Sequence, residues 1–292
     1  MKNKPLVAGI GELLWDILPG GKQMGGATTN FGYHASQAGC RAFVISAIGA
    51  DNWGEEILER FNQLELDKGF IQQTGNLPTG TVTVSLNENG IPSYIIHENV
   101  AWDHIEWNNR LETLAKSVDA VCFGSLAQRN SESRQTILNF LKATRKDCLR
   151  VFDINLRQSF FNRKIIVQSL LLSTILKLNE DELPVVAGLL GISGTDEALL
   201  IQIFQMFDLK LIALTKGANG SVLFNGKEQS FLEAPKVKIA DTVGAGDSFT
   251  AVLVAGLLQN HELKQIHEKA TQVSAFVCTQ KGATPAMPET LC

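Results

Sequence analysis

A glycine-rich stretch near the carboxyl end of the chain carries the strongest chemical signal. Residues 241–249 read Asp-Thr-Val-Gly-Ala-Gly-Asp-Ser-Phe and lead into an apolar segment. A glycine-rich turn that enters a helix exposes unpaired backbone N–H groups at the positive end of the helix dipole, and such a site holds anions. The N–H groups of Gly244, Ala245 and Gly246 therefore predict a cradle for a phosphoryl group. Asp247 is placed to accept a hydroxyl proton, although an isolated Asp there is more often only a favourable first-turn residue.

Two further segments give this stretch a wider context. Residues 25–30 read Gly-Gly-Ala-Thr-Thr-Asn, and residues 47–54 read Ala-Ile-Gly-Ala-Asp-Asn-Trp-Gly. In this order, and with residues 241–247, they resemble the signatures of the ribokinase-like (phosphofructokinase B type) carbohydrate kinases along nearly the whole chain. The resemblance implies transfer of the γ-phosphoryl group of ATP to a sugar hydroxyl, with Asp247 as the base. It also implies an anion hole in place of a Walker loop, and the sequence contains no Gly-x-x-x-x-Gly-Lys-Ser/Thr.

The resemblance assigns a set of acceptor-binding residues. Asp16 matches the aspartate that binds sugar hydroxyls, a role that suits a charged acceptor. Gly26 and Asn30 stand where members contact the sugar, although Asn30 is equally a helix cap. Asn155 and Arg157 belong to Asp-Ile-Asn-Leu-Arg, which resembles the family's Asp-x-Asn-x-Arg. Arg157 suits phosphate geometry, and a structural ion pair is its alternative role.

A second set is implied for the nucleotide and its metal. Asn179 and Glu182 match the Asn-x-x-Glu motif, in which Glu182 would hold Mg²⁺ through water. Helix capping explains the same pattern and is compatible with it. The nucleotide residues implied by the resemblance are Asn179, Thr215, Gly217, Gly220 and Gly282. The expected cofactors are ATP and Mg²⁺, and a monovalent cation such as K⁺ is left open.

The choice of sugar depends on weaker features. Gly11-Glu12-Leu13-Leu14-Trp15-Asp16 and the Gly-Gly-Ala at 25–27 are similar to fructokinases, so fructose is the expected acceptor and fructose 6-phosphate the product. Ribose or a 2-keto-3-deoxy sugar acid is the alternative, and Arg129 is the candidate cation for an acid's carboxylate. A catalytically silent sugar-binding regulator would usually lose the base or the glycine-rich turn, and both are present here.

The elements that must position these residues alternate along the chain. Short runs that are apolar on both faces predict parallel strands covered by helices on each side, at 6–10, 42–48, 120–123, 150–154, 174–178 and 210–214. Amphipathic segments predict helices near 29–38, 54–65, 131–145, 195–207, 246–259 and 263–280. The pattern indicates an α/β fold with a mainly parallel central sheet. The resemblance implies a ribokinase-like three-layer α/β/α sandwich over residues 1–292, with a small β-sheet lid.

One segment interrupts this alternation. Residues 80–86 alternate polar and apolar, Asn89-Gly90 is a turn signal, and 93–96 follow as a second strand, so a β-hairpin is predicted. Either a lid over a cleft or an edge of the main sheet is consistent with this pattern. The lid implied by the resemblance would comprise roughly residues 12–30 and 79–103, and a homodimer through it is a further expectation.

Composition narrows the function classes. The 292 residues carry a net charge of −4, which gives no basic field for nucleic acid or membrane binding. No apolar run reaches the ~20 residues that cross a bilayer, and five scattered cysteines favour reduced thiols and a cytoplasmic protein. A nicotinamide dehydrogenase would need Gly-x-Gly-x-x-Gly after its first strand, and residues 9–14 lack the third glycine.

Overall fold

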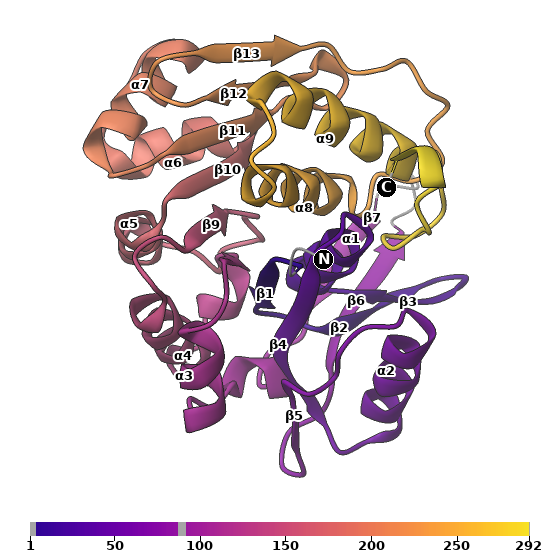
Figure 1. Ribbon diagram of the computed structural model, residues 1–292. Coiled ribbons are helices and arrows are strands. Elements are labelled where there is room, and N and C mark those ends of the chain that lie inside the picture. The colour runs from indigo at the N-terminus through magenta and orange to yellow at the C-terminus, as the bar shows by residue number, and fades with distance from the viewer. Residues whose placement is uncertain (1–3, 87–91, 292) are drawn as a thin grey trace.

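A nine-stranded sheet forms the centre of the molecule. The computed structural model describes residues 4–86 and 92–291 (Figure 1). The strand order is β13-β12-β11-β10-β9-β8-β1-β4-β5, parallel from β5 to β11 and antiparallel for β12 and β13. The strands are β1 Leu6–Ile10, β4 Arg41–Gly49, β5 Ile71–Thr74, β8 Ala120–Phe123, β9 Leu149–Asp153, β10 Ile175–Asn179, β11 Leu211–Thr215, β12 Ser221–Phe224 and β13 Gln229–Leu232.

Alternate residues of the central strands enter two different hydrophobic cores. Val7 and Ile175 pack in the core that contains Phe31 and Phe249, whereas their neighbours along the strands pack in the other. One core is therefore covered by α1, α8 and α9, and the other by α3 to α7, which gives three layers. The helices are α1 Ala27–Gln37, α2 Asn52–Gln63, α3 Asn109–Ala115, α4 Ser131–Ala143, α5 Arg163–Leu172, α6 Glu182–Leu190, α7 Asp196–Met206, α8 Ala245–Leu258 and α9 Leu263–Cys278.

A separate four-stranded sheet lies beside the central one. Its order is β3-β2-β6-β7, with β2 Leu14–Leu18, β3 Gly21–Gly25, β6 Gly80–Leu86 and β7 Pro92–Ile96. Val82, Val84 and Ile96 are buried in the main core, while Tyr94 and Ile95 are each 54% exposed. The predicted hairpin is therefore part of its own sheet and not an edge of the central sheet, and its turn at 87–91 lies outside the described residues. This four-stranded sheet is called the lid below.

The sequence predicted this framework with small errors at its ends. The six predicted main strands and six predicted helices are present, with ends displaced by a few residues. The predicted lid ranges contain all four of its strands, although Ala27 already begins α1 and Ala101 begins a 3₁₀ helix. The predicted α/β fold with a mainly parallel central sheet and a small separate sheet is confirmed. Within the described residues, the structure contains no helix that is both long and apolar enough to cross a membrane.

Candidate active site

The predicted site residues gather at the carboxyl ends of the parallel strands. Asp16 follows β1, Asn155 and Arg157 follow β9, and Asn179 and Thr215 are the last residues of β10 and β11. Asn179 and Thr215 are direct partners in the parallel ladder, so both end at the same edge. Ligands of open α/β sheets bind outside this edge, because the loops that leave it diverge to form a crevice.

The glycine-rich turn begins α8. Gly244 is the N-cap residue with φ 80°, and a Cβ at this position would lie 2.6 Å from the carbonyl oxygen of Ala283, so only glycine fits. The N–H of Ala245 donates to the carbonyl of Thr242 at 3.3 Å. Of the three predicted anion-binding N–H groups, that of Ala245 is thus already engaged within the turn.

Asp247 lies in the first turn of α8 and is held by α1. The side-chain amide of Asn30 donates to Asp247 Oδ2 at 2.8 Å. Burial raises the pKa of Asp247 to about 7, and the Asp153 carboxylate adds to the rise, while the Asn30 hydrogen bond and the charges of Lys177 and Arg157 oppose it. A carboxyl group with a pKa near neutrality, fixed by a hydrogen bond, has the properties of a general base.

A buried ionic cluster that the sequence did not predict lies beneath this turn. Lys177 Nζ lies 3.1 Å from Asp153 Oδ1, and Thr250 Oγ1 donates to Asp153 Oδ2 at 2.8 Å. A Cβ on Gly246 would lie 3.0 Å from Lys177 Nζ, so the ammonium group is adjacent to the glycine-rich turn. The available sequence signal was a single charge in the otherwise apolar β10 segment Ile-Leu-Lys-Leu.

The lid and the start of α1 supply the predicted acceptor residues. Asp16 is on β2, where burial raises its pKa to about 6 and the positive charge of Arg157 opposes the rise. Gly26 has φ 120°, and a Cβ there would collide with the carbonyl of Glu12, which explains the glycine. The side-chain carbonyl oxygen of Asn30, Oδ1, is buried without a hydrogen-bond partner. Asn30 thus contacts both Asp247, through its side chain, and Gly26, through its backbone N–H at 3.0 Å.

Arg157 and Arg129 differ from each other in their pairing. Arg157 is exposed and has no ion pair among the described residues, so its alternative role as a structural ion pair is not observed. Arg129 is buried and pairs with Asp103, Nε to Oδ1 at 2.7 Å and Nη2 to Oδ2 at 2.8 Å. Arg129, the candidate cation for the carboxylate in the sugar-acid alternative, is therefore already paired with an acidic side chain.

Asn179 and Glu182 fix the end of β10 through reciprocal hydrogen bonds. Asn179 Oδ1 accepts from the N–H groups of Asp181 and Glu182 at 2.9 Å each, and Glu182 Oε2 accepts from the N–H of Asn179 at 2.8 Å. Glu182 Oε1 accepts from the N–H of Leu156 at 2.8 Å. The helix-start arrangement is confirmed, and the role of Glu182 toward a metal stays a prediction.

The remaining glycines that are predicted to contact the nucleotide lie in two separate turns. Gly217 begins a short 3₁₀ helix after β11 and Gly220 ends it, with φ 50° and 92°. The N–H of Gly282 donates to Asp241 Oδ2 at 3.2 Å, so the C-terminal segment contacts the start of the 241–247 motif. His34 Nε2 lies 2.8 Å from the carbonyl oxygen of Ala283 and anchors the same segment to α1.

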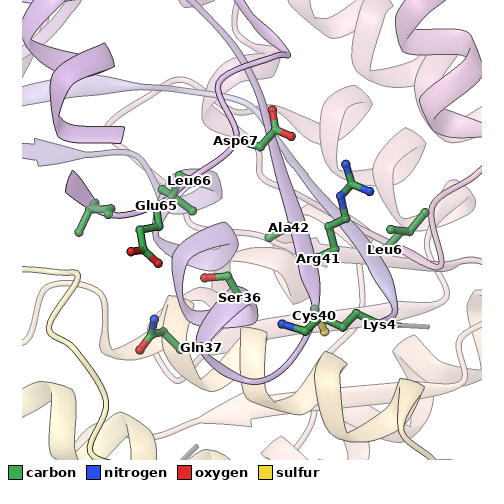
Figure 2. A pocket seen from close by; sticks show the side chains of 11 residues that line it. Lys4, Leu6, Ser36, Gln37, Cys40, Arg41, Ala42, Glu65, Leu66 and Asp67 are labelled. Carbon is green, nitrogen blue, oxygen red and sulfur yellow. The ribbon is translucent and has the colours of Figure 1, made fainter. Parts of the chain in front are cut away.

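The opposite edge of the sheet also carries a cavity. Its volume is about 790 Å³, it lies at the amino ends of β1 and β4, and Figure 2 shows the side chains that line it. Its lining includes Lys4, Ser36, Arg41 and Asp67 and contains no residue that the sequence predicted for the site. This cavity is therefore separate from the predicted site residues.

Comparison with known proteins decides the family. The pfkB family of carbohydrate kinases matches residues 19–290. The chain belongs to this family. It is 27% identical to a sugar kinase of Pyrococcus horikoshii, over 98% of this chain and 94% of the relative, whose crystal structure in complex with ATP superposes with a TM-score of 0.81 over 97% of this chain and 95% of that one.

Other pfkB relatives differ in the acceptor that their names state. The chain is 26% identical to an ATP-dependent 6-phosphofructokinase of Thermoanaerobacterium thermosaccharolyticum, over 92% of this chain and 83% of the relative. It is 25% identical to a fructokinase of Escherichia coli, over 96% and 95%. The protein is a sugar kinase of the pfkB family, and its particular sugar needs a separate argument.

Proposed function

We propose that the protein transfers the γ-phosphoryl group of ATP to a hydroxyl of fructose and forms fructose 6-phosphate. The observation that carries this proposal is Asp247, whose carboxylate lies beside the glycine-rich turn and is held at 2.8 Å by Asn30. A base next to an anion site has the arrangement needed for phosphoryl transfer to an alcohol. The relatives named fructokinases, at about 25% identity, support the choice of fructose.

The acceptor binds between the lid and the start of α1 in this proposal. Asp16 accepts hydrogen bonds from two sugar hydroxyls, and Gly26 and Asn30 contact the sugar through backbone and amide groups. Asn155 and Arg157 approach from the loop after β9. The sugar CH₂OH then attacks the γ-phosphorus in line as Asp247 removes its proton, while the bond to the β–γ bridging oxygen breaks and ADP leaves. The N–H groups of Gly244 and Gly246 stabilise the developing charge.

The nucleotide binds along the ends of β10 and β11 in this proposal. Asn179, Thr215, Gly217, Gly220 and Gly282 contact ATP, as the family resemblance implies. Glu182 would hold Mg²⁺ through water, because this ion gives up its water shell reluctantly, and the bound ion would supply charge neutralisation at the phosphates. Glu182 fits this role because it is a nearly buried carboxylate next to Asn179. Dependence on K⁺ remains a prediction.

The charged side chains around the proposed acceptor site favour a neutral sugar over a sugar acid. Asp16 faces the acceptor region, and Arg129 is already paired with Asp103. Arg157 is the one positive group assigned to the acceptor among the described residues, and it lies near three carboxyls, those of Glu12, Asp16 and Asp247. A substrate carboxylate would add a fourth negative group there.

A coupled ADP-release assay across a sugar panel tests the function. The panel contains fructose, ribose, glucose, fructose 6-phosphate and 2-keto-3-deoxygluconate, and mass spectrometry identifies the product. We expect the highest kcat/KM for fructose. A tenfold or greater preference for another sugar rejects fructose and keeps the kinase, whereas ATP and sugar binding without any transfer supports a silent regulator.

A homodimer through the lid is the remaining part of the proposal. Tyr94 and Ile95 are exposed side chains on β7, an edge strand of the lid. Exposed apolar side chains on an edge strand favour association with a second chain. Sedimentation of the unmodified protein and of Ile95→Lys tests this, because only a lid-mediated dimer dissociates in the variant.

A further inference from the structure

The loop that follows β9 has an unusual backbone. Asn155 and Gln158 have positive φ values of 47° and 48°, and Arg157 lies between them. Left-handed conformations are unfavourable for residues other than glycine and persist where the surrounding structure enforces them. One such constraint is Glu182, which accepts a hydrogen bond from the N–H of Leu156. The position of Arg157 therefore depends on contacts made from outside its own loop.

Two side chains connect this loop to the end of the lid. Gln158 Nε2 donates to the carbonyl oxygen of Tyr94 on β7 at 2.7 Å. Arg129 Nη2 donates to the carbonyl oxygen of His97, just after β7, at 2.6 Å, and its guanidinium carbon lies 4.8 Å from the ring centroid of Phe160. Gln158 thus connects the loop to the middle of β7, and Arg129 contacts both the residue after β7 and Phe160 of the loop.

Two of the three guanidinium nitrogens of Arg129 make hydrogen bonds, whereas Nη1 is buried without a hydrogen-bond partner. Two of its nitrogens pair with the two oxygens of Asp103, and its guanidinium carbon lies 4.0 Å from the ring centroid of Trp102. The side chains of Arg129 and Asp103 are only 5% and 3% exposed. Lysine cannot reproduce a stacked, bidentate arrangement, so the geometry and not the charge alone is specific to arginine.

We infer that Arg129 and Gln158 are positioning residues that fix the end of β7 to the loop carrying Arg157, so that Asp16 of the lid and Arg157 meet the same sugar. These two residues and their contacts with Tyr94, His97 and Phe160 are called the clasp. The inference rests on the proposed function for the place of the sugar. Since β2, which carries Asp16, pairs with β6, and β6 pairs with β7, a fixed β7 also fixes Asp16. The charge of Arg157 acts on the Asp16 carboxyl, which supports their proximity.

The clasp predicts a specific kinetic signature. Misplacement of an orienting group weakens interactions with the acceptor and leaves the nucleotide side unchanged. Gln158→Glu keeps the length of the side chain but removes the donor to Tyr94, and because Gln158 is exposed the fold should survive. We expect KM for fructose to rise about three- to tenfold, with KM for ATP unchanged within twofold. Arg129→Lys keeps the charge, and we expect a larger rise in the same KM.

Matched controls separate positioning from general destabilisation. Gln135→Glu alters another exposed glutamine, which bonds only within α4 to Asn139, and its kinetics should equal those of the unmodified protein. Thermal unfolding of each variant reports the loss of stability. If Gln158→Glu and Arg129→Lys leave KM for fructose unchanged, or raise KM for ATP equally, the clasp has no positioning role.

Hydrogen exchange gives a readout that does not need turnover. In Gln158→Glu, amides of β7 should exchange faster than in the unmodified protein, while those of β8 and β9 should not change. If β7 exchanges faster in the variant but the unmodified protein phosphorylates no sugar, the proposed function is rejected and the clasp remains as a structural contact. Unchanged exchange in β7 together with active kinase would reject the clasp and keep the proposed function.

Discussion

The carboxyl edge of the central sheet and the lid hold their charged side chains in different ways. At the sheet edge, Asp247 is bonded to Asn30, and Asp153 is bonded to Lys177 and Thr250 in the interior. In the lid, Asp16 lies on β2. Burial raises the pKa of its carboxyl group, and the charge of Arg157, from the loop after β9, opposes this rise. Groups fixed by a closed core suit a chemical step, whereas groups on a sheet with one solvent-exposed face suit substrate capture.

Asp247→Asn should separate the two regions most strongly. An amide cannot accept the proton, so kcat should fall by ~10²–10⁴, as the loss of a general base typically does. The dissociation constant for fructose, measured by calorimetry, should change much less because the lid residues remain. A folded variant with near-normal kcat would contradict the role of Asp247 as base.

The same variant should be more stable near neutral pH. The pKa of Asp247 is raised from 3.8 to about 7, so the folded state binds more protons than the unfolded state between these values. The stability from this group is present at low pH and is lost as the pH rises through about 7. Asp247→Asn should therefore melt at a higher temperature than the unmodified protein at pH 8, with a smaller difference at pH 4.

Gly244→Ala is the next largest perturbation of the sheet edge. The added Cβ would meet the Ala283 carbonyl at 2.6 Å in a left-handed conformation, so the turn must move. Displacement of one donor to a developing oxyanion costs about 10²–10³ in kcat. Gly188→Ala in α6 is the control, since a Cβ there meets nothing within 4 Å. Equal kinetics for both variants would show that the turn does not hold the phosphoryl group.

Asp16→Asn should weaken the binding of the sugar by the lid. Loss of a charge-assisted hydrogen bond should lower kcat/KM for fructose by roughly 10- to 100-fold, mainly through KM. KM for ATP should not change, because Asp16 lies on β2 of the lid and not at the strand ends assigned to the nucleotide. A loss confined to kcat would mean that Asp16 acts in the chemical step.

The smallest expected effect is a change in the rate of amide hydrogen exchange in the lid when fructose binds. If the lid closes over the sugar, amides of β6 and β7 should exchange more slowly when fructose is present, by up to roughly tenfold at ten times the dissociation constant. Amides of the central strands β8 and β9 should change little. Equal protection of β6 and β7 with and without fructose would contradict the lid function.

The sequence predicted those parts of the fold and site that local patterns encode. Runs apolar on both faces identified β8 and β11, because parallel strands are buried on each side. The glycine-rich turn at Gly244 followed from helix-terminus chemistry. The bond between Asn30 and Asp247 could not be predicted from local pattern, since 217 residues separate the two.

The errors have the same physical origin. Lys177 and Asp153 form their pair only after β9 and β10 align, and no local signal specifies that register. The pairing of Arg129 with Asp103 likewise had no local signal, because 26 residues separate the two. Short strands such as β3 and β13 also gave no distinct periodicity, because their residues are only partly buried.

The dependence of kcat/KM for fructose on pH tests the central claim most directly, because it reports the ionisation of the base in the enzyme before the sugar binds. The measurement uses limiting fructose and saturating ATP with Mg²⁺ from pH 5 to 9, on the unmodified protein and on Asp247→Asn. With a pKa of about 7 for Asp247, kcat/KM of the unmodified protein should fall roughly tenfold for each pH unit below that value. The residual activity of Asp247→Asn should lack this inflection. An inflection near pH 7 that persists in Asp247→Asn would contradict the assignment of Asp247 as the group that removes the proton.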